Sequence, residues 1–178
     1  MRAYSKRASI AWRFCRAAGS HDDEPLRLTS CSARITLRLI RSAIDTGPLV
    51  ALLNSRDAHH RWATQTLDKI SPPLHTCEAV VSEACFLVRN LKGGPDAVLA
   101  LLARGLVVPD FHLDSELDAI RKLVSKYSTV PMSLADACLV RMAELDHDLG
   151  IITLDEDFRI YRRHGRQQLP VVMPESRS

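Results

Sequence analysis

The sequence predicts an α/β fold of three layers, in which a central, mostly parallel sheet of four to five short strands is flanked by helices. Two observations predict it. From residue 42 onward, short apolar runs alternate with stretches of helical length, which is typical of a parallel sheet covered on both faces. The 178 residues, 46% of them hydrophobic, are also enough for one well-buried domain and few for two.

Five short segments are expected to be strands, because each is an apolar run bounded by turn residues. They are residues 43–44, 74–76, 106–108, 150–153 and 171–173. The first run ends at Asp45, and Thr46-Gly47-Pro48 then leads into a helix.

The stretches between these strands are expected to be helices. They are residues 49–53, 58–70, 78–90, 95–104, 114–126, 134–145 and 157–163. Pro95 suits the first turn of its helix, and Ser133 can cap the helix that follows it. Ser71-Pro72-Pro73 and Lys92-Gly93-Gly94 break the chain between helices.

Residues 1–41 differ in composition from the predicted domain of residues 42–175. The first 43 residues carry nine Lys/Arg and three Asp/Glu, which leaves fifteen and eighteen for the rest, so the body is acidic despite the net charge of +3. The segment could be a disordered basic tail, a transit peptide, or translated sequence upstream of the real start. Its acidic residues weaken the targeting interpretation, so we expect a disordered or artefactual extension.

Charge and hydropathy narrow the possible functions. No run approaches the ~20 apolar residues of a membrane-spanning helix, so a soluble, cytoplasmic protein without membrane contact is expected. An acidic body argues against a broad cationic surface, so nucleic acid would be bound locally or through metal. The cysteines are odd in number, without C-x-x-C spacing, and are expected to be buried thiols in a reducing compartment: Cys15, Cys31, Cys77, Cys85 and Cys138.

Candidate functional residues are the acids near strand ends, because ligands of open parallel sheets bind outside the carboxyl ends of the strands. Asp45 follows the first strand, and Asp155 and Asp157 follow the fourth. Asp136 lies in the first turn of its helix, where the helix dipole favours an anion. Glu83 has mostly apolar sequence neighbours, and burying an unpaired carboxylate there would cost several kcal/mol.

Each acid alone has a structural explanation, as a turn residue, a helix cap or a satisfied structural acid. Together they indicate a cation site, because clustered carboxylates repel one another unless a cation or a proton compensates them. Oxygen-only ligands select hard ions such as Mg²⁺ or Mn²⁺. Such ions can activate water at a phosphodiester and attract the phosphate to an otherwise negative site.

Four motifs resemble the PIN domain, specifically the VapC-type toxins, over about Ser42 to Met173: Ile44-Asp45-Thr46-Gly47, Val81-Ser82-Glu83-Ala84, Ser133-Leu134-Ala135-Asp136-Ala137 and Ile152-Thr153-Leu154-Asp155-Glu156-Asp157-Phe158. The resemblance implies a PIN-like fold and a catalytic, metal-binding quartet of Asp45, Glu83, Asp136 and Asp155, with Asp157 auxiliary. It also implies a Mg²⁺-dependent endoribonuclease, the toxin of a toxin-antitoxin pair, that forms a homodimer and has a VapB-like antitoxin. The extension of about 40 residues departs from similar proteins.

Other residues near these acids have two interpretations each. Thr46 and Thr153 could orient a carboxylate or a metal-bound water, or be ordinary turn and strand-end residues. Three arginines of the basic group after the last acid could contact RNA phosphates or form a solvated face: Arg159, Arg162 and Arg163. His59 and His60 beside Trp62 could face nucleic acid, although a helix that packs Trp62 inward is the simpler account.

Three other functions compete with RNA cleavage. Asp45-Thr46-Gly47 matches the aspartic-protease triplet, but such proteases are built of β-strands and need two triplets. A phosphatase or receiver domain would use Asp45 as a nucleophile. A catalytically inactive PIN-like module that binds only RNA or protein is the main rival, although it would gain nothing from uncompensated acids.

Overall fold

The computed structural model describes residues 41–175, so the expected extension lies outside the described residues except for Arg41, which begins the first strand. Five strands form one sheet in the order β3-β2-β1-β4-β7, and every neighbouring pair is parallel. The strands are β1 (Arg41–Ile44), β2 (Leu74–Thr76), β3 (Val107–Pro109), β4 (Leu149–Ile152) and β7 (Val171–Val172). All five correspond to predicted strands, and the α/β prediction is confirmed.

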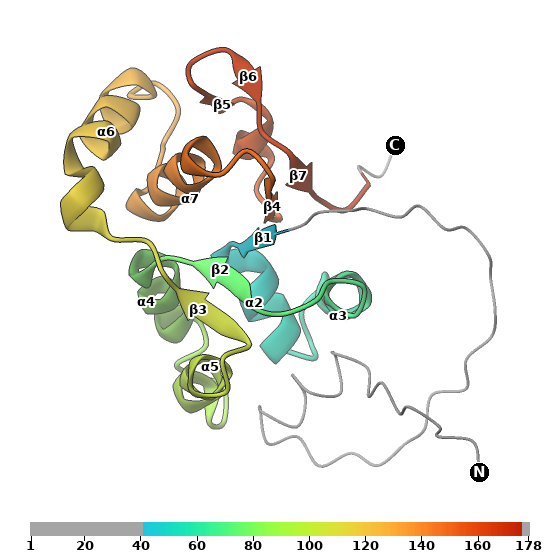
Figure 1. The fold of residues 1–178 in the computed structure, drawn as a ribbon. Helices are drawn as coiled ribbons and strands as arrows, with labels where there is room; N and C mark the ends of the chain where they lie inside the picture. Colours follow the sequence, from blue (N-terminus) through green and yellow to red (C-terminus); the bar gives the residue numbers. More distant parts are fainter. Residues whose placement is uncertain (1–40, 176–178) are drawn as a thin grey trace, which may run out of the picture.

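Six α-helices cover the two faces of this sheet (Figure 1). Right-handed crossovers explain their distribution: the chain moves outward through β1, β2 and β3 with helices on one face, then returns to β4 with helices on the other. The first face carries α2 (Thr46–Leu53), α3 (His60–Leu67), α4 (Glu78–Leu87) and α5 (Gly94–Ala103). The second carries α6 (Leu113–Lys126) and α7 (Leu134–Leu145), which pack on each other. No helix of the described chain is long and apolar enough to cross a membrane.

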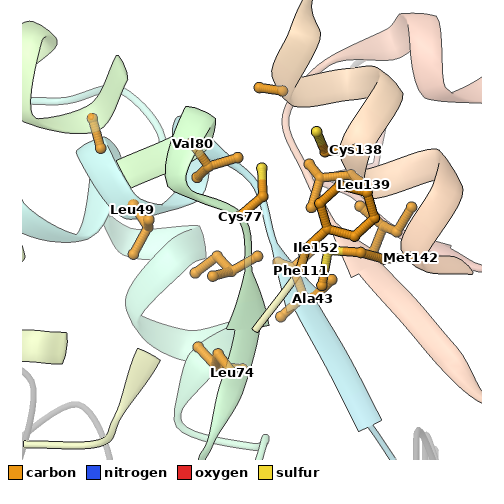
Figure 2. Close-up of a cluster of buried hydrophobic side chains, with 14 of the residues drawn as sticks. Ala43, Leu49, Leu74, Cys77, Val80, Phe111, Cys138, Leu139, Met142 and Ile152 are labelled. Atoms are coloured by element: carbon orange, nitrogen blue, oxygen red, sulfur yellow. The ribbon is translucent and has the colours of Figure 1, made fainter. Parts of the chain in front are cut away.

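The core lies between the sheet and both helix layers (Figure 2). The central strands contribute Ala43, Ile44, Ile151 and Ile152, none of which is exposed to solvent. Strands buried on both faces need continuous apolar runs, which is the pattern of 43–44 and 150–153. Cys77 and Cys138 are buried in this core as free thiols, as expected, while Cys85 is half-buried and free.

The predicted helix at 157–163 is wrong. A short 3₁₀ helix, η1 (Glu156–Arg159), precedes a two-stranded antiparallel hairpin of β5 (Arg162–Arg163) and β6 (Gln167–Gln168). His164 and Gly165 turn the chain with φ of 49° and 75°, in the left-handed region that ends a helix. The arginines of this segment favour helix by propensity, but tertiary contacts override it, since Tyr161 is fully buried immediately before the hairpin.

Candidate functional site

The candidate site lies where β1 and β4, neighbours at the centre of the sheet, reach their carboxyl ends. Ile44 pairs with Ile152, so Asp45 and Thr153 leave the two strands side by side. The Asp45 N–H donates to the carbonyl of Ile152 at 3.0 Å, which extends the ladder by one step. From β1 the chain runs to β2 on one side, and β4 lies on the other, so this is the switch point at which such sheets bind ligands.

Asp45 is the most enclosed acid of the site, with only 6% of its surface exposed. Its Oδ1 accepts the Thr46 N–H at 2.6 Å, which caps α2, and its Oδ2 accepts the Thr153 hydroxyl at 2.7 Å. Burial raises the pKa of Asp45 from 3.8 to about 6, against the lowering effect of these two hydrogen bonds. The charges of Asp136 and Glu83 raise it further.

Thr153 links the two strand ends. Its fully buried hydroxyl donates to Asp45 and accepts the Asp155 N–H at 2.9 Å. Asp155 in turn accepts the Asp157 N–H at 2.9 Å through Oδ1 and so caps η1. Asp155 is exposed and Asp157 half-buried. Thr153 therefore holds both the Asp45 carboxylate and the backbone of Asp155 in place.

Asp136 is held in the first turn of α7 by a capping box. Its backbone N–H donates to the Ser133 hydroxyl at 3.0 Å, and its Oδ2 accepts the Ser133 N–H at 2.8 Å. Burial is the largest cause of its raised pKa, and the charges of Asp155 and Glu83 add to it. Asp136 is only 7% exposed, and its buried carboxylate is subject to the negative charges of two exposed acids, Asp155 and Glu83.

Glu83 does not lie in the apolar surroundings that its sequence neighbours predicted. It is exposed, because α4 buries Val80 and Ala84 and turns Glu83 outward. The apolar neighbours in sequence lie on other sides of the helix, and Phe86 is itself 61% exposed. The Thr46 hydroxyl nevertheless donates to Glu83 Oε2 at 3.0 Å, which ties α4 to the start of α2.

Electrostatic effects link the four predicted acids in pairs. The charges of Asp136 and Glu83 raise the pKa of Asp45, and those of Asp155 and Glu83 raise the pKa of Asp136. The buried Tyr161 has a raised pKa, first because of burial and then because of the charges of Asp136, Asp157 and Asp155. Among residues 41–175, no Lys, Arg or His forms an ion pair with any of the four.

Their donor chemistry fits a hard divalent cation. Capping and hydroxyl contacts occupy one oxygen each of Asp136, Asp155 and Glu83, and within the described chain the other oxygen of each has no hydrogen-bond donor. Carboxylate oxygens without cationic partners are the ligands that Mg²⁺ and Mn²⁺ prefer. As the side chains of residues 41–175 stand, no three or more His, Cys, Asp or Glu already surround one point.

The basic group after the acids is largely engaged with backbone carbonyls. Arg162 Nη1 donates to the carbonyls of Arg159, Ile160 and Tyr161, and Arg163 Nη1 donates to that of His147. Arg159 is exposed and pairs with Glu156. The proposed contact of these arginines with RNA phosphates stays a prediction.

The histidines and Trp62 at the start of α3 follow the simpler of the two interpretations, in which the helix packs Trp62 inward. Trp62 packs partly buried against the core, and His60 Nδ1 lies 2.7 Å from the carbonyl of Ala51. His59 is exposed.

Two residues of the site were missed from the sequence. Ser133 was interpreted only as a helix cap, although the spacing Ser-x-x-Asp is itself the signal of a capping box that would hold Asp136. Tyr161 is fully buried and subject to the charges of Asp136, Asp157 and Asp155, and its ring lies 5.4 Å from that of Phe158. No sequence signal separates Tyr161 from an ordinary core aromatic residue.

Comparison with known proteins decides the family, since residues 43–163 match the PIN domain. The chain belongs to the PIN domain family. The match begins within β1 and ends in β5, so it includes all four acids and both threonines.

Two relatives of this PIN domain are VapC proteins of Mycobacterium tuberculosis. Ribonuclease VapC26 of strain ATCC 25618 / H37Rv is 30% identical over 132 residues, which are 72% of this chain and 92% of that protein. The crystal structure of VapC20, described as a toxin that cleaves the sarcin-ricin loop, superposes with a TM-score of 0.55 at 25% identity. That match covers 65% of this chain and 91% of VapC20. The PIN-like fold that the sequence motifs implied is thereby confirmed.

Proposed function

We propose that this PIN domain is a metal-dependent endoribonuclease of the VapC kind, the toxin of a toxin-antitoxin pair. The observation that carries the proposal is that Asp45 and Asp136 are both buried and each is subject to the charges of other predicted acids, while none of the four acids has an ion-pair partner within the described chain. The names of both VapC relatives, a ribonuclease and a toxin that cleaves RNA, support the same activity.

Asp45, Glu83, Asp136 and Asp155 would hold Mg²⁺ or Mn²⁺, with Asp157 as an auxiliary acid. A bound divalent ion supplies positive charge at the phosphate and leaving oxygen and makes water more acidic. The pKa of about 6 leaves Asp45 mostly ionised at pH 7, so its carboxylate is available as a ligand.

The protein's own contribution is to fix these carboxylates before the reaction. Thr153 holds Asp45 from one side, Thr46 bonds Glu83, and Ser133 fixes Asp136. Hydrogen-bond partners of this kind limit how far a carboxylate can turn, and they commonly contribute tenfold or more to metal affinity or activity. Thr46 and Thr153 therefore act as positioning residues in this proposal.

The partners follow from the same proposal. RNA is the substrate, and a VapB-like antitoxin would inhibit the toxin by covering the site. A homodimer and a cytoplasmic location belong to the proposal as well, since they fit a toxin that acts on cellular RNA. The domain is taken as residues 42–175.

Single substitutions of the buried acids test the proposal. Asp45→Ala and Asp136→Ala are expected to lower Mg²⁺-dependent RNA cleavage at least ~1,000-fold, because each removes a ligand that is used in the transition state. EDTA should abolish cleavage by the parent, and Mn²⁺ should restore it. Asp148→Ala, which removes an exposed acid away from the cluster, is the matched control and should cleave as the parent does.

Circular dichroism confirms that each variant is folded before its rate is compared. Equal rates for the parent and both site variants would contradict the assignment. A folded parent that binds RNA without cleaving it in Mg²⁺ or Mn²⁺ would favour the inactive binding module instead.

A further inference from the structure

A groove follows the outer side of α6, apart from the four acids. Two adjoining open hollows of about 650 and 490 Å³ form it, and they share Asp118, Lys122 and Lys126 as lining residues. The turn of the β5–β6 hairpin borders the larger hollow through His164 and Gly165. Figure 1 shows α6 and this hairpin on the same side of the domain as α7.

Most acids of the groove are already neutralised inside it. Arg141 pairs with Glu116 at 2.7 Å and with Glu144 at 2.9 Å, and Glu144 also accepts the His164 N–H at 2.8 Å. Burial lowers the pKa of Arg141, but Glu144 and Glu116 raise it more, so the net shift is upward. The charge of Arg141 is therefore neutralised by acids of the protein itself.

The lysines of the groove have no such partners. Lys122 and Lys126 are exposed and form no ion pair within the described chain, and the same holds for Arg121 beside them. Asp118 is the single groove acid without an ion-pair partner among residues 41–175. The groove is thus locally cationic in a domain whose acids outnumber its Lys and Arg.

The spacing of the two lysines along α6 suits an anionic chain. Lys122 and Lys126 are one helical turn apart on the same face, where like charges repel and an anionic chain would relieve the repulsion. The hairpin turn closes on the second lysine: a Cβ added to Gly165 would lie 3.6 Å from Lys126 Nζ. Both lysines therefore line the larger hollow, which the hairpin turn borders.

Two aromatic residues link Lys126 in the groove to the acid cluster. The Lys126 ammonium lies 4.8 Å from the centre of the Tyr127 ring, and the Tyr127 hydroxyl accepts the Arg162 N–H at 2.9 Å. Tyr127 packs edge-on against Tyr161 with ring centres 5.1 Å apart. Tyr161 is close enough to Asp136, Asp155 and Asp157 for their charges to raise its pKa, so two aromatic residues in edge-on contact lie between Lys126 and the acids.

We propose that the α6–hairpin groove, through Lys122 and Lys126, binds the sugar-phosphate backbone of RNA on one flank of the bond that the acid site cuts. The inference rests on the proposed ribonuclease function. Arg162 and Arg163 are weaker candidates for this role because their guanidinium groups already bond backbone carbonyls, whereas the lysines form no ion pair within the described chain. Phosphate binding by such lysines is a sequence-independent contact that positions the substrate.

Salt-dependent binding of a fluorescent single-stranded RNA to the full chain, in EDTA to prevent cleavage, tests the groove. The double variant Lys122→Gln/Lys126→Gln should lower the slope of log affinity against log salt by about 1.4, from two phosphate contacts, and weaken binding roughly tenfold at 0.1 M salt. Lys69→Gln/Lys92→Gln removes the same charge from exposed lysines elsewhere and should change neither. Equal effects of the two double variants, or none from the first, would overturn the proposal.

Two further measurements separate the possible failures. In Mg²⁺, the groove variant should raise KM for a long RNA with kcat unchanged, and should cleave a short oligonucleotide as the parent does. If the parent cleaves no RNA but the groove variant still shows the expected loss of slope, the ribonuclease proposal fails and the groove proposal stands. If a polyglutamate peptide competes as well as an RNA of equal charge, the groove binds acidic protein and the RNA assignment is wrong.

Discussion

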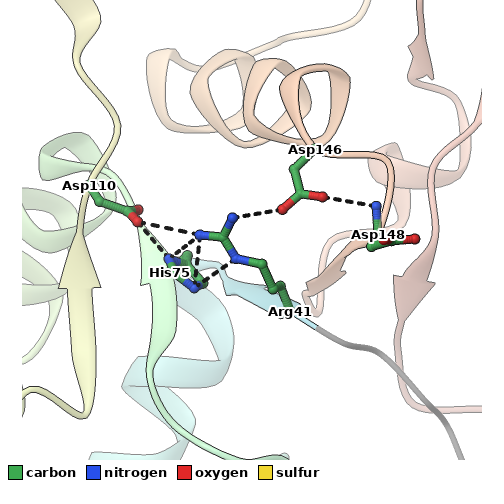
Figure 3. A network of polar contacts seen from close by, with 5 residues as sticks. All are labelled: Arg41, His75, Asp110, Asp146 and Asp148. Atoms are coloured by element: carbon green, nitrogen blue, oxygen red, sulfur yellow. Dashed lines mark hydrogen bonds and ion pairs between the residues drawn. The ribbon is translucent and has the colours of Figure 1, made fainter.

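Two groups of carboxylates in this domain meet opposite surroundings. At the amino end of β1, Arg41 reaches Asp146 at 2.9 Å and Asp110 at 3.7 Å, and His75 Nδ1 lies 2.7 Å from Asp110 (Figure 3). At the carboxyl end of the same strand, Asp45 lies among other acids, and no cation of the described residues pairs with it.

The difference separates acids that the protein neutralises itself from the acids that we propose to bind a cation. The Arg41 network neutralises its acids and joins β1, β2 and the end of α7. The acids around Asp45 are oriented by hydroxyls and N–H groups but not neutralised. Uncompensated buried charge destabilises a fold, so it persists where an external cation compensates it.

The largest expected effect concerns stability against pH. In EDTA, the folded state holds a proton on Asp45 up to about pH 6, whereas the unfolded chain loses it near pH 3.8. The folded state binds the proton more tightly, so protonated Asp45 adds to the free energy of unfolding. This contribution is fully present below about pH 4 and is lost as pH rises through 6. Chemical denaturation should show a loss of about 3 kcal/mol from this group.

A comparison of variants isolates the contribution of Asp45. Asp45→Asn should reduce the loss between pH 4 and pH 6.5 by most of that amount, because it cannot titrate. Asp146→Asn, from the neutralised group, serves as the charge-matched control and should leave it in place. Parallel profiles for the parent and Asp45→Asn would show that the buried acid is not destabilised as described.

The next effect concerns the positioning hydroxyl. Thr153→Val keeps the shape of a fully buried side chain but removes its hydrogen bonds to Asp45 and Asp155, so Mn²⁺ affinity should fall roughly 10- to 100-fold in a calorimetric titration. Thr76→Val is matched, because Thr76 is equally buried and its hydroxyl bonds only the carbonyl of Ile44. Equal losses in both variants would reduce Thr153 to a structural threonine.

The smallest effect belongs to the neutralised group. Arg41→Gln should cost about 1 kcal/mol of unfolding free energy, since the Arg41 side chain is 47% exposed and exposed ion pairs contribute little. Thermal and urea unfolding measure this cost. Mn²⁺ affinity should be unchanged, and a fall would mean that the two groups of acids are coupled through β1.

The strands were predicted correctly from the sequence because they depend on local patterns, and the candidate acids were chosen from the same patterns. The apolar runs at 43–44 and 150–153 reflect burial on two faces, and a strand end followed by Asp is visible in the letters. The hairpin after Arg159 was not predictable in this way, because it depends on contacts of Tyr161 with Tyr127 far away in the chain.

The surroundings of the acids were also beyond local reasoning. Glu83 has apolar sequence neighbours yet is exposed, since a helix distributes neighbours around its axis. The hydroxyl of Thr46 on Glu83 joins residues 37 positions apart, and that of Thr153 on Asp45 joins residues 108 apart. Such pairs become visible only when the sheet order is known.

A titration of the metal-free protein with Mn²⁺, followed by calorimetry, tests most directly whether the uncompensated acids form one cation site. The parent, Asp110→Asn and Asp146→Asn should bind with the same affinity, while Asp136→Asn and Asp155→Asn should each bind at least ~10-fold more weakly. Binding by the parent that neither Asp136→Asn nor Asp155→Asn weakens would contradict the account, as would a folded parent that binds no Mn²⁺.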